Sequence, residues 1–157
     1  MKDAAPRQYA YFLIVISVAF SSFLVRLNNY LVNISLPTIT RTFGVTSGEA
    51  SQIISSYLLI ITTTLLLFGK LGDRIGLKKI FIAGYVIFTA GSLMCGFSQN
   101  ITLLIGSRFI QGVGSSMLLA VSFAIISHYL PPGKTGWAFG ITSTASALGV
   151  ATGAPIG

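Results

Sequence analysis

Long uncharged stretches separate short clusters of charge along this chain. The stretches cover residues 8–25, 27–40, 50–69, 80–107, 109–133 and 135 to the end. A helix crosses the hydrocarbon core of a bilayer with about 20 mainly apolar residues, and most of the stretches are long enough for that. They lack the alternation of barrel strands and exceed their roughly 10-residue length. The pattern therefore predicts membrane-spanning α-helices.

Charges and helix breakers divide the pattern into five predicted spans. We place these spans at about 9–36, 51–68, 80–97, 103–129 and 136–157. Pro37 ends the first span, because a proline inside a helix loses a backbone hydrogen bond. A polar turn at 98–100 follows the third span, and the breaker at 131–133 follows the fourth. The fifth span is still apolar at the last residue, so we expect a chain truncated in or after its fifth helix.

The composition agrees with a lipid environment. Hydrophobic residues make up 53% of the chain and charged residues only 8%, against roughly 25% charged residues in soluble domains. The net charge of +7 alone could indicate a nucleic-acid partner, since basic chains bind phosphate backbones. The apolar runs argue against that, so we expect a lipid bilayer as partner and no nucleic acid.

The basic residues are distributed unequally between the two sides of the predicted spans. Two lie in the N-terminal tail, four between the second and third spans and one between the fourth and fifth, whereas Arg41 stands alone on the other side. Cytoplasmic loops carry the excess of Lys and Arg. We therefore expect a multi-pass protein of the plasma (inner) membrane with a cytoplasmic N-terminus.

The segment between the second and third spans combines glycines with charges. It reads GKLGDRIGLKK over residues 69–79. Glycine tolerates positive φ and allows two helix ends to turn back sharply, so we expect Asp73 and Arg74 to lie in a tight hairpin. The alternative is a loop whose cations only fix the topology. The candidate residues here are Gly69, Asp73, Arg74, Gly76, Lys78 and Lys79.

Two of the predicted spans carry polar residues at helical spacing. An arginine inside a span costs about 2.5 to 3.5 kcal/mol on insertion scales and usually faces a bundle interior or a watery cavity. The alternatives are an arginine that reaches the interface and asparagines that only bond helices together. The candidate cavity or coupling residues are Arg26, Asn28, Asn29 and Asn33 in the first span, and Arg108 and Gln111 in the fourth.

Small residues recur along the fifth span. Gly149 and Gly153 share one helical face and permit close helix contact, and Gly140 precedes them by nine residues or more. Pro155 removes a backbone donor and favours a kink. The alternative is the small-residue packing common to membrane helices.

Four segments resemble signatures of the major facilitator superfamily, in that family's order. Residues 69–79 are similar to its loop GxLaDrxGrkxxl, and residues 108–114 to its fourth-helix pattern RxxQGxG. Residues 27–37 resemble LDxTvvNvALP of the drug:proton antiporter branch with fourteen helices, with Asn28 in place of the acid. Residues 140–155 resemble the antiporter signature Gx8Gx3GPx2GG, with Ala154 before the proline.

The resemblance implies an all-α membrane protein, with five helices of an N-terminal six-helix transporter half. It implies a cytoplasmic gate at Asp73 and Arg74, and alternating access around a central site near the midplane. The implied function is secondary active transport of a small organic solute, with proton-coupled export expected. Its partners are the solute, protons and the missing C-terminal half.

Other readings stay open at this point. Asn28 supplies no titratable carboxylate, which favours metabolite uptake or facilitated diffusion, and a non-transporting membrane scaffold is also possible. Two arginines in the expected cavity favour an anionic or neutral solute. The chain contains no metal, cofactor or catalytic motif of the kinds that mark enzymes, so we expect no enzyme, no metal and no cofactor.

Overall fold

Five helices make up the part of the chain that the structure describes. The computed structural model describes residues 4–156. The helices are α1 (Ala4–Phe43), α2 (Ser47–Ile75), α3 (Leu77–Gly96), α4 (Ile101–Tyr129) and α5 (Pro132–Ile156), and no strand occurs in the described residues. Helices α1 to α4 are long and apolar enough to cross a membrane. The predicted all-α membrane fold is confirmed.

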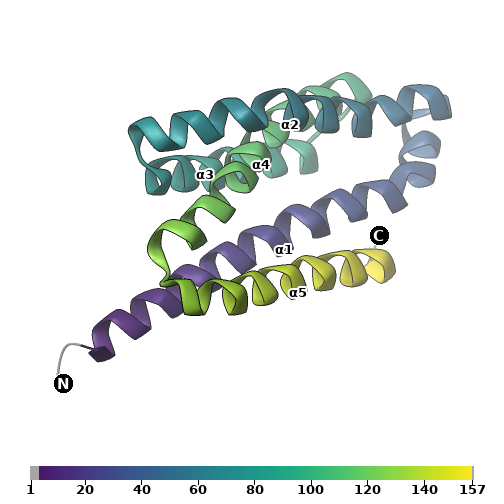
Figure 1. The fold of residues 1–157 in the computed structure, drawn as a ribbon. Helices are drawn as coiled ribbons and strands as arrows, with labels where there is room; N and C mark the ends of the chain where they lie inside the picture. The colour runs from purple at the N-terminus through teal and green to yellow at the C-terminus, as the bar shows by residue number, and fades with distance from the viewer. Residues whose placement is uncertain (1–3, 157) are drawn as a thin grey trace.

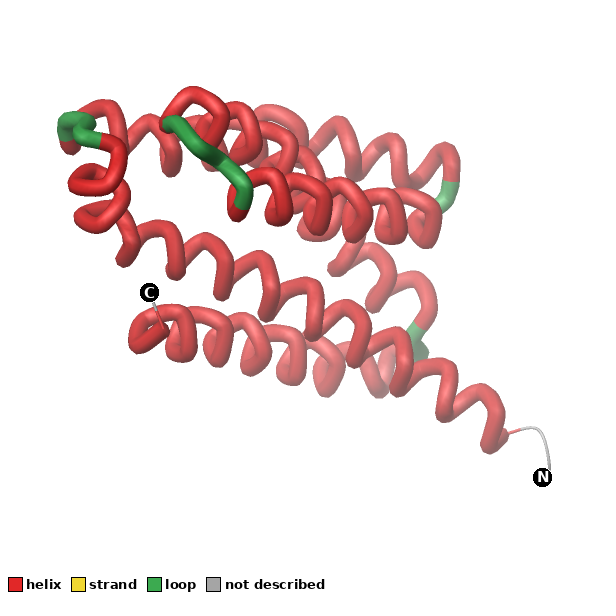
Figure 2. Tube along the Cα trace, turned by 180° about the vertical axis from the view of Figure 1, so that it is seen from behind, coloured by secondary structure: helices red, strands yellow, loops and turns green. Residues whose placement is uncertain are grey.

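The helices form two groups. Helices α2, α3 and α4 pack together, while α1 and α5 lie side by side along their length (Figures 1 and 2). Helix α4 starts in the first group, and its carboxyl-terminal end approaches the α1–α5 pair (Figure 1). The main core cluster follows this path and includes Val15 and Val18 of α1, Ile80 of α3, and Val121 and Ile126 of α4.

Helix α4 is the central helix of the described chain. In its most apolar window 61% of the residues are buried, compared with 11% in α2. Small residues on α4 allow this packing. A Cβ added to Gly114 would meet the backbone of Phe88 on α3, so only glycine permits so close a helix contact there.

Helix α1 continues beyond the predicted end of the first span. It runs through Pro37 to Phe43, so the predicted helix stop at Pro37 is wrong. Pro37 cannot donate to the carbonyl group of Asn33, but membrane helices tolerate proline when the local structure compensates. Beyond the proline the chain stays helical, and the hydroxyl of Thr40 donates to the Pro37 carbonyl at 2.8 Å, a local bond one turn further on. A helix of 40 residues is about 60 Å long, so α1 extends beyond a hydrocarbon core of roughly 30 Å.

The connection between α2 and α3 is shorter than predicted. Asp73 and Arg74 lie in the last turn of α2, and Gly76 alone separates the two helices, with φ +107°. The helices turn back sharply at Gly76 as predicted, but Asp73 and Arg74 belong to the end of α2 and not to a loop. Charged residues at the membrane surface can remain helical, because water solvates their side chains while the backbone keeps its hydrogen bonds.

Side chains cap the amino-terminal ends of α2 and α4. Thr46 and Glu49 form a capping box at α2, in which the Thr46 amide donates to Glu49 Oε2 at 2.8 Å. Asn100 caps α4, because its Oδ1 accepts a hydrogen bond from the Leu103 amide at 2.8 Å. The polar turn predicted at 98–100 thus lies directly before α4.

Candidate functional site

Arg108 lies within α4 and is almost completely buried, with 2% of its surface exposed. Its Nη1 donates one hydrogen bond to Asn28 Oδ1 on α1 at 2.8 Å and another to Gln111 Oε1 on α4 at 2.6 Å. The guanidinium also lies over the ring of Tyr57 on α2, 5.3 Å from its centroid, a distance suited to a cation–π interaction. One buried cation therefore links α1, α2 and α4.

Neighbouring side chains extend these contacts to α3. Gln111 Nε2 donates to Ser92 Oγ on α3 at 2.6 Å, and the Tyr57 hydroxyl donates to Ser115 Oγ at 2.8 Å. Ser115 in turn donates to the main-chain carbonyl of Gln111 at 3.0 Å. We call this set the Arg108 network; its members are Asn28, Tyr57, Ser92, Arg108, Gln111 and Ser115. The network connects four of the five helices.

The positive charge of Arg108 is surrounded by neutral groups. The acids among the described residues are Glu49 and Asp73, which lie in the first and last turns of α2. The Nε atom of Arg108 is buried and has no hydrogen-bond partner in the described part of the chain. An unsatisfied buried donor costs about 1–3 kcal/mol. The centre of this bundle can therefore attract a further acceptor or an anion.

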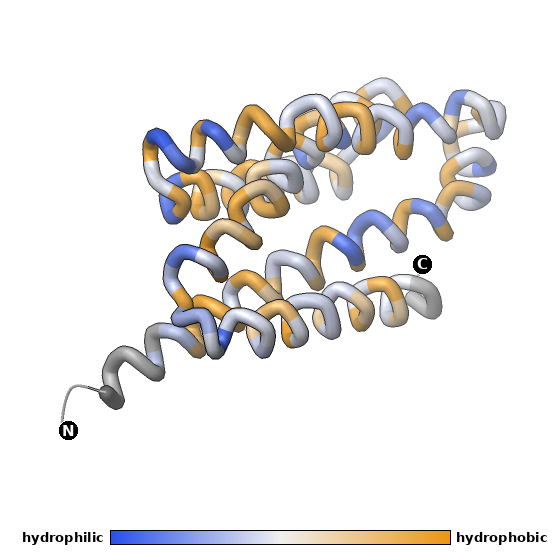
Figure 3. The backbone as a smooth tube through the Cα atoms, viewed as in Figure 1, coloured by the Kyte–Doolittle hydropathy of each residue, from blue (hydrophilic) through white to orange (hydrophobic). Residues whose placement is uncertain are grey.

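The other predicted residues of α1 lie outside the Arg108 network. Asn33 Nδ2 donates to the main-chain carbonyl of Asn29 at 3.0 Å, a local bond within α1. Arg26 is exposed and lines a separate hollow between α1, α4 and α5. In the coloured part of α1, Figure 3 shows the polar positions gathered towards the carboxyl-terminal end. Of the predicted α1 residues, Asn28 is thus the one that contacts Arg108. The roles predicted for all these residues, in lining a cavity or coupling transport, stay predictions.

Tyr57 and Ser92 belong to the network but were not predicted from the sequence. Both lie on helices that carry other hydroxyl-bearing residues, such as Ser56 beside Tyr57 and Thr89 near Ser92, and tyrosine and serine are common in membrane helices. Tyr57 is 1% exposed, and a buried phenol needs a partner. The position of Tyr57 inside the uncharged stretch 50–69 could have indicated a buried, hydrogen-bonded phenol. Nothing in the sequence indicated a role for Ser92.

The residues of the predicted gate lie together at the connection between α2 and α3. Asp73 and Arg74 at the end of α2, and Lys78 and Lys79 at the start of α3, are all exposed. Gly76 forms the turn, and Gly69 lies one to two turns earlier within α2, where an added Cβ would meet open space. These charges are available to a partner, and their role as a gate stays a prediction.

The glycines of α5 differ in their surroundings. A Cβ added to Gly149 would lie 2.5 Å from the Phe23 carbonyl oxygen of α1, and one added to Gly153 would lie 2.9 Å from Tyr30 Cβ. At Gly140 nothing lies within 4 Å of such a Cβ. Close contact between α5 and α1 thus depends on Gly149 and Gly153. The side chain of Pro155 lies outside the described ones, and the kink predicted there stays a prediction.

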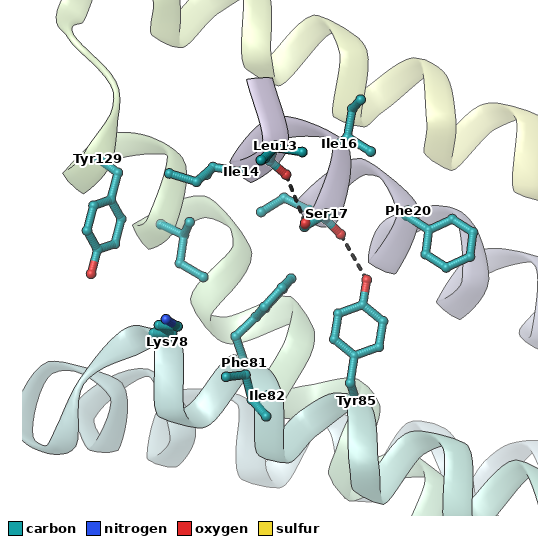
Figure 4. A pocket seen from close by; sticks show the side chains of 12 residues that line it. Leu13, Ile14, Ile16, Ser17, Phe20, Lys78, Phe81, Ile82, Tyr85 and Tyr129 are labelled. Atoms are coloured by element: carbon teal, nitrogen blue, oxygen red, sulfur yellow. Dashed lines mark hydrogen bonds between the residues drawn. The ribbon is translucent and has the colours of Figure 1, made fainter. Parts of the chain in front are cut away.

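A mainly apolar groove of about 610 Å³ lies between α1 and α3, with the end of α4 beside it (Figure 4). Leu13, Phe20 and Phe81 are among its lining residues, and the Tyr85 hydroxyl donates to the Ser17 carbonyl across it at 2.9 Å. Its walls present few polar groups, so it suits hydrocarbon rather than a polar solute. The polar chemistry lies elsewhere, in the Arg108 network and around Arg26.

Comparisons with known proteins place this arrangement in a family. Residues 18–157 match the family model described as Major Facilitator Superfamily. The chain is 36% identical over 145 residues to the riboflavin transporter RibZ of Clostridioides difficile, covering 92% of this chain and 32% of RibZ. It is 38% identical over 114 residues to MdtD of Yersinia pestis, whose name refers to multidrug resistance, covering 73% of this chain and 24% of MdtD.

The chain spans about a third or less of the length of these relatives. These similarities agree with the resemblance to the drug:proton antiporter type, and the name of RibZ describes a transporter. The family match and the apolar helices together identify a multi-pass membrane protein. The chain belongs to the Major Facilitator Superfamily.

Proposed function

We propose that this chain forms part of the N-terminal half of a longer secondary transporter, the parent protein, which exports a small organic solute in exchange for protons by alternating access. The observation that carries the proposal is the buried Arg108 network. An intramembrane arginine is costly and marks a functional site by default. Transport folds of this kind place their sites where helices of the two halves meet near the midplane.

The neutral partners of Arg108 support a role in binding or coupling. Asn28 and Gln111 hold the guanidinium by hydrogen bonds of 2.8 and 2.6 Å but do not neutralise it. A carboxylate from the other half of the parent protein would be attracted to this charge. The proton-carrying acid of the exchange then comes from the remainder of the parent protein, because the described acids lie at the ends of α2.

The charges at the helix ends support an orientation with the N-terminus in the cytoplasm of a cell with an inner membrane. Lys70, Arg74, Lys78 and Lys79 lie around the α2–α3 connection, and Lys134 lies at the start of α5. At the opposite helix ends Arg41 and Glu49 nearly balance each other. The positive-inside rule places the first set on the cytoplasmic side.

A second candidate function is uptake or facilitated diffusion of a metabolite. Asn28 favours it, because the residue nearest to the Arg108 charge on α1 cannot bind and release a proton near neutral pH. The similarity to a riboflavin transporter favours a metabolite as the solute. Riboflavin is therefore included among the solutes to be tested.

Transport by the parent protein in inverted membrane vesicles separates the two candidates. The assay compares uptake of riboflavin and of a panel of fluorescent dyes with and without an imposed pH gradient, acidic inside. Export coupled to protons predicts accumulation above the outside concentration, abolished when a protonophore collapses the gradient. Equilibration at the same rate with and without the gradient would instead assign facilitated diffusion, and no flux for any solute would contradict both.

A further inference from the structure

A second polar region lies in a hollow of about 380 Å³ between α1, α4 and α5. Small-molecule sites in proteins commonly measure about 300–1,000 Å³, so the hollow can hold part of a small solute. Its lining residues come from α1 and α5, which lie side by side, and from the part of α4 that approaches this pair (Figure 1). Its polar lining residues are Ser22, Arg26, Ser122, Thr142, Ser143 and Ser146.

Some of the hydroxyl groups in this hollow are free to donate. Ser122 donates to the Leu118 carbonyl at 2.6 Å, and Thr142 donates to the Ala138 carbonyl at 2.9 Å, which leaves these two oxygens as acceptors only. Within the described residues, the hydroxyls of Ser22, Ser143 and Ser146 make no side-chain hydrogen bond. These three can turn their O–H groups towards a bound acceptor.

Arg26 supplies the charge of the hollow. It lies well inside α1 and is exposed, and the described acids lie at the two ends of α2. An arginine within a membrane span faces a water-filled cavity or a partner rather than lipid. Arg108 differs from it, because Arg108 is 2% exposed and its Nη1 is already bonded to Asn28 and Gln111. Of the two arginines, Arg26 is therefore the one that a solute can reach.

We propose that this hollow, with Arg26 and the hydroxyls of Ser22, Ser143 and Ser146, is a subsite for the oxyanion group of an organic solute, a carboxylate or a phosphate ester. The proposal rests on the proposed transport function and assigns a substrate class to it. A planar guanidinium binds two oxygens of such a group at once. Free serine hydroxyls beside it supply further donors, which a cationic solute could not use.

Thiol labelling in the parent protein tests the anion preference without knowledge of the natural solute. In a version without native cysteines, including Cys95→Ala, a reporter thiol is introduced as Ser146→Cys. Its reaction rates are measured with an anionic reagent, methanethiosulfonate ethylsulfonate, and a cationic one, methanethiosulfonate ethyltrimethylammonium, from both sides of the membrane. Thr144→Cys on the same helix, outside the hollow, is the matched control position.

The expected result is an anion-to-cation rate ratio at the Ser146→Cys thiol that falls about tenfold when Arg26→Gln is added. This is the change expected for one unit charge acting on reagents of opposite sign across several ångströms of watery space. The ratio at the Thr144→Cys thiol is expected to stay within about twofold. An unchanged ratio at Ser146→Cys, or no labelling there by either reagent from either side, would overturn the subsite.

The labelling result is independent of transport. If the ratio shifts as expected but the parent protein moves no solute in vesicles, the transport function fails while the anion preference of the hollow stands. If transport occurs and Arg26→Gln leaves the ratio unchanged, the transport function stands and the subsite is wrong.

Discussion

Arg108 on α4 donates a hydrogen bond of 2.8 Å to the side-chain oxygen of Asn28 on α1, residues separated by 80 positions in the chain. The antiporter signature that residues 27–37 resemble has an acid at this position, whereas here the guanidinium contacts a neutral amide. The contact connects the two groups of helices in the described chain. Its chemistry decides whether the network can respond to protons.

Asn28→Asp is expected to strengthen this contact and make it sensitive to pH. A hydrogen bond between two ionised groups is roughly twice as strong as a neutral one. The melting temperature in detergent should rise at pH 8, and the gain should disappear as the pH falls and the new carboxylate is protonated. Asn29→Asp is the matched control, because Asn29 does not contact Arg108. Equal pH responses of the two variants would contradict the assignment.

Tyr57→Phe is expected to cost little, and Tyr57→Leu clearly more. The phenylalanine keeps the ring beneath the guanidinium and loses only the 2.8 Å bond to Ser115, worth about 0.6 kcal/mol on average for such bonds in membranes. The leucine also removes the cation–π contact, worth up to about 2 kcal/mol when desolvated. Thermal unfolding in detergent measures the order. Equal losses would show that the ring contributes nothing to holding Arg108.

Gly149→Val is expected to destabilise the protein, whereas Gly140→Val is not. The new side chain at Gly149 would collide with the Phe23 carbonyl of α1, 2.5 Å from the first added carbon, and overpacking typically costs about 1–3 kcal/mol. At Gly140 the same atom meets open space. Expression and melting temperature of the two variants provide the comparison. A stable Gly149→Val protein would mean that α5 does not pack closely on α1.

Asp73→Asn is expected to lower the rate of transport by the parent protein several-fold without changing its melting temperature. Asp73 is exposed at the end of α2, so its carboxylate is free to interact with a positive helix terminus in the other half. Solute flux in vesicles and thermal unfolding are measured on the same preparation. A loss of stability that matches the loss of flux would assign Asp73 to folding rather than to a gate.

The positions of the helices could be predicted from the sequence because the bilayer imposes a minimum apolar length. A helix of the structure lies at each of the five predicted ranges, and α1 to α4 are apolar enough to cross a membrane. Their ends could not be predicted equally well. Charge marks the edge of the hydrocarbon, but a helix such as α2 continues past Lys70 and Asp73, and α1 continues through Pro37.

The candidate site was predictable only as far as polar residues stand out against apolar runs. Arg108, Gln111 and Asn28 could be found in this way, and the structure brings them together. Tyr57 and Ser92 come from other helices, and their participation depends on how α2 and α3 pack against α4. Arg26 and Arg108 look alike in the sequence. Only the packing makes one of them exposed and the other buried.

The most direct test of the account is solute flux through the parent protein with Arg108→Gln, compared with Arg41→Gln at matched expression and folding. Arg41 is an exposed arginine near the end of α1, so its loss should leave flux within about twofold of wild type. Arg108→Gln keeps an amide donor but removes the charge, and the account predicts a loss of flux of at least tenfold with the protein still folded. Wild-type flux in Arg108→Gln would contradict the claim that the Arg108 network is central to transport.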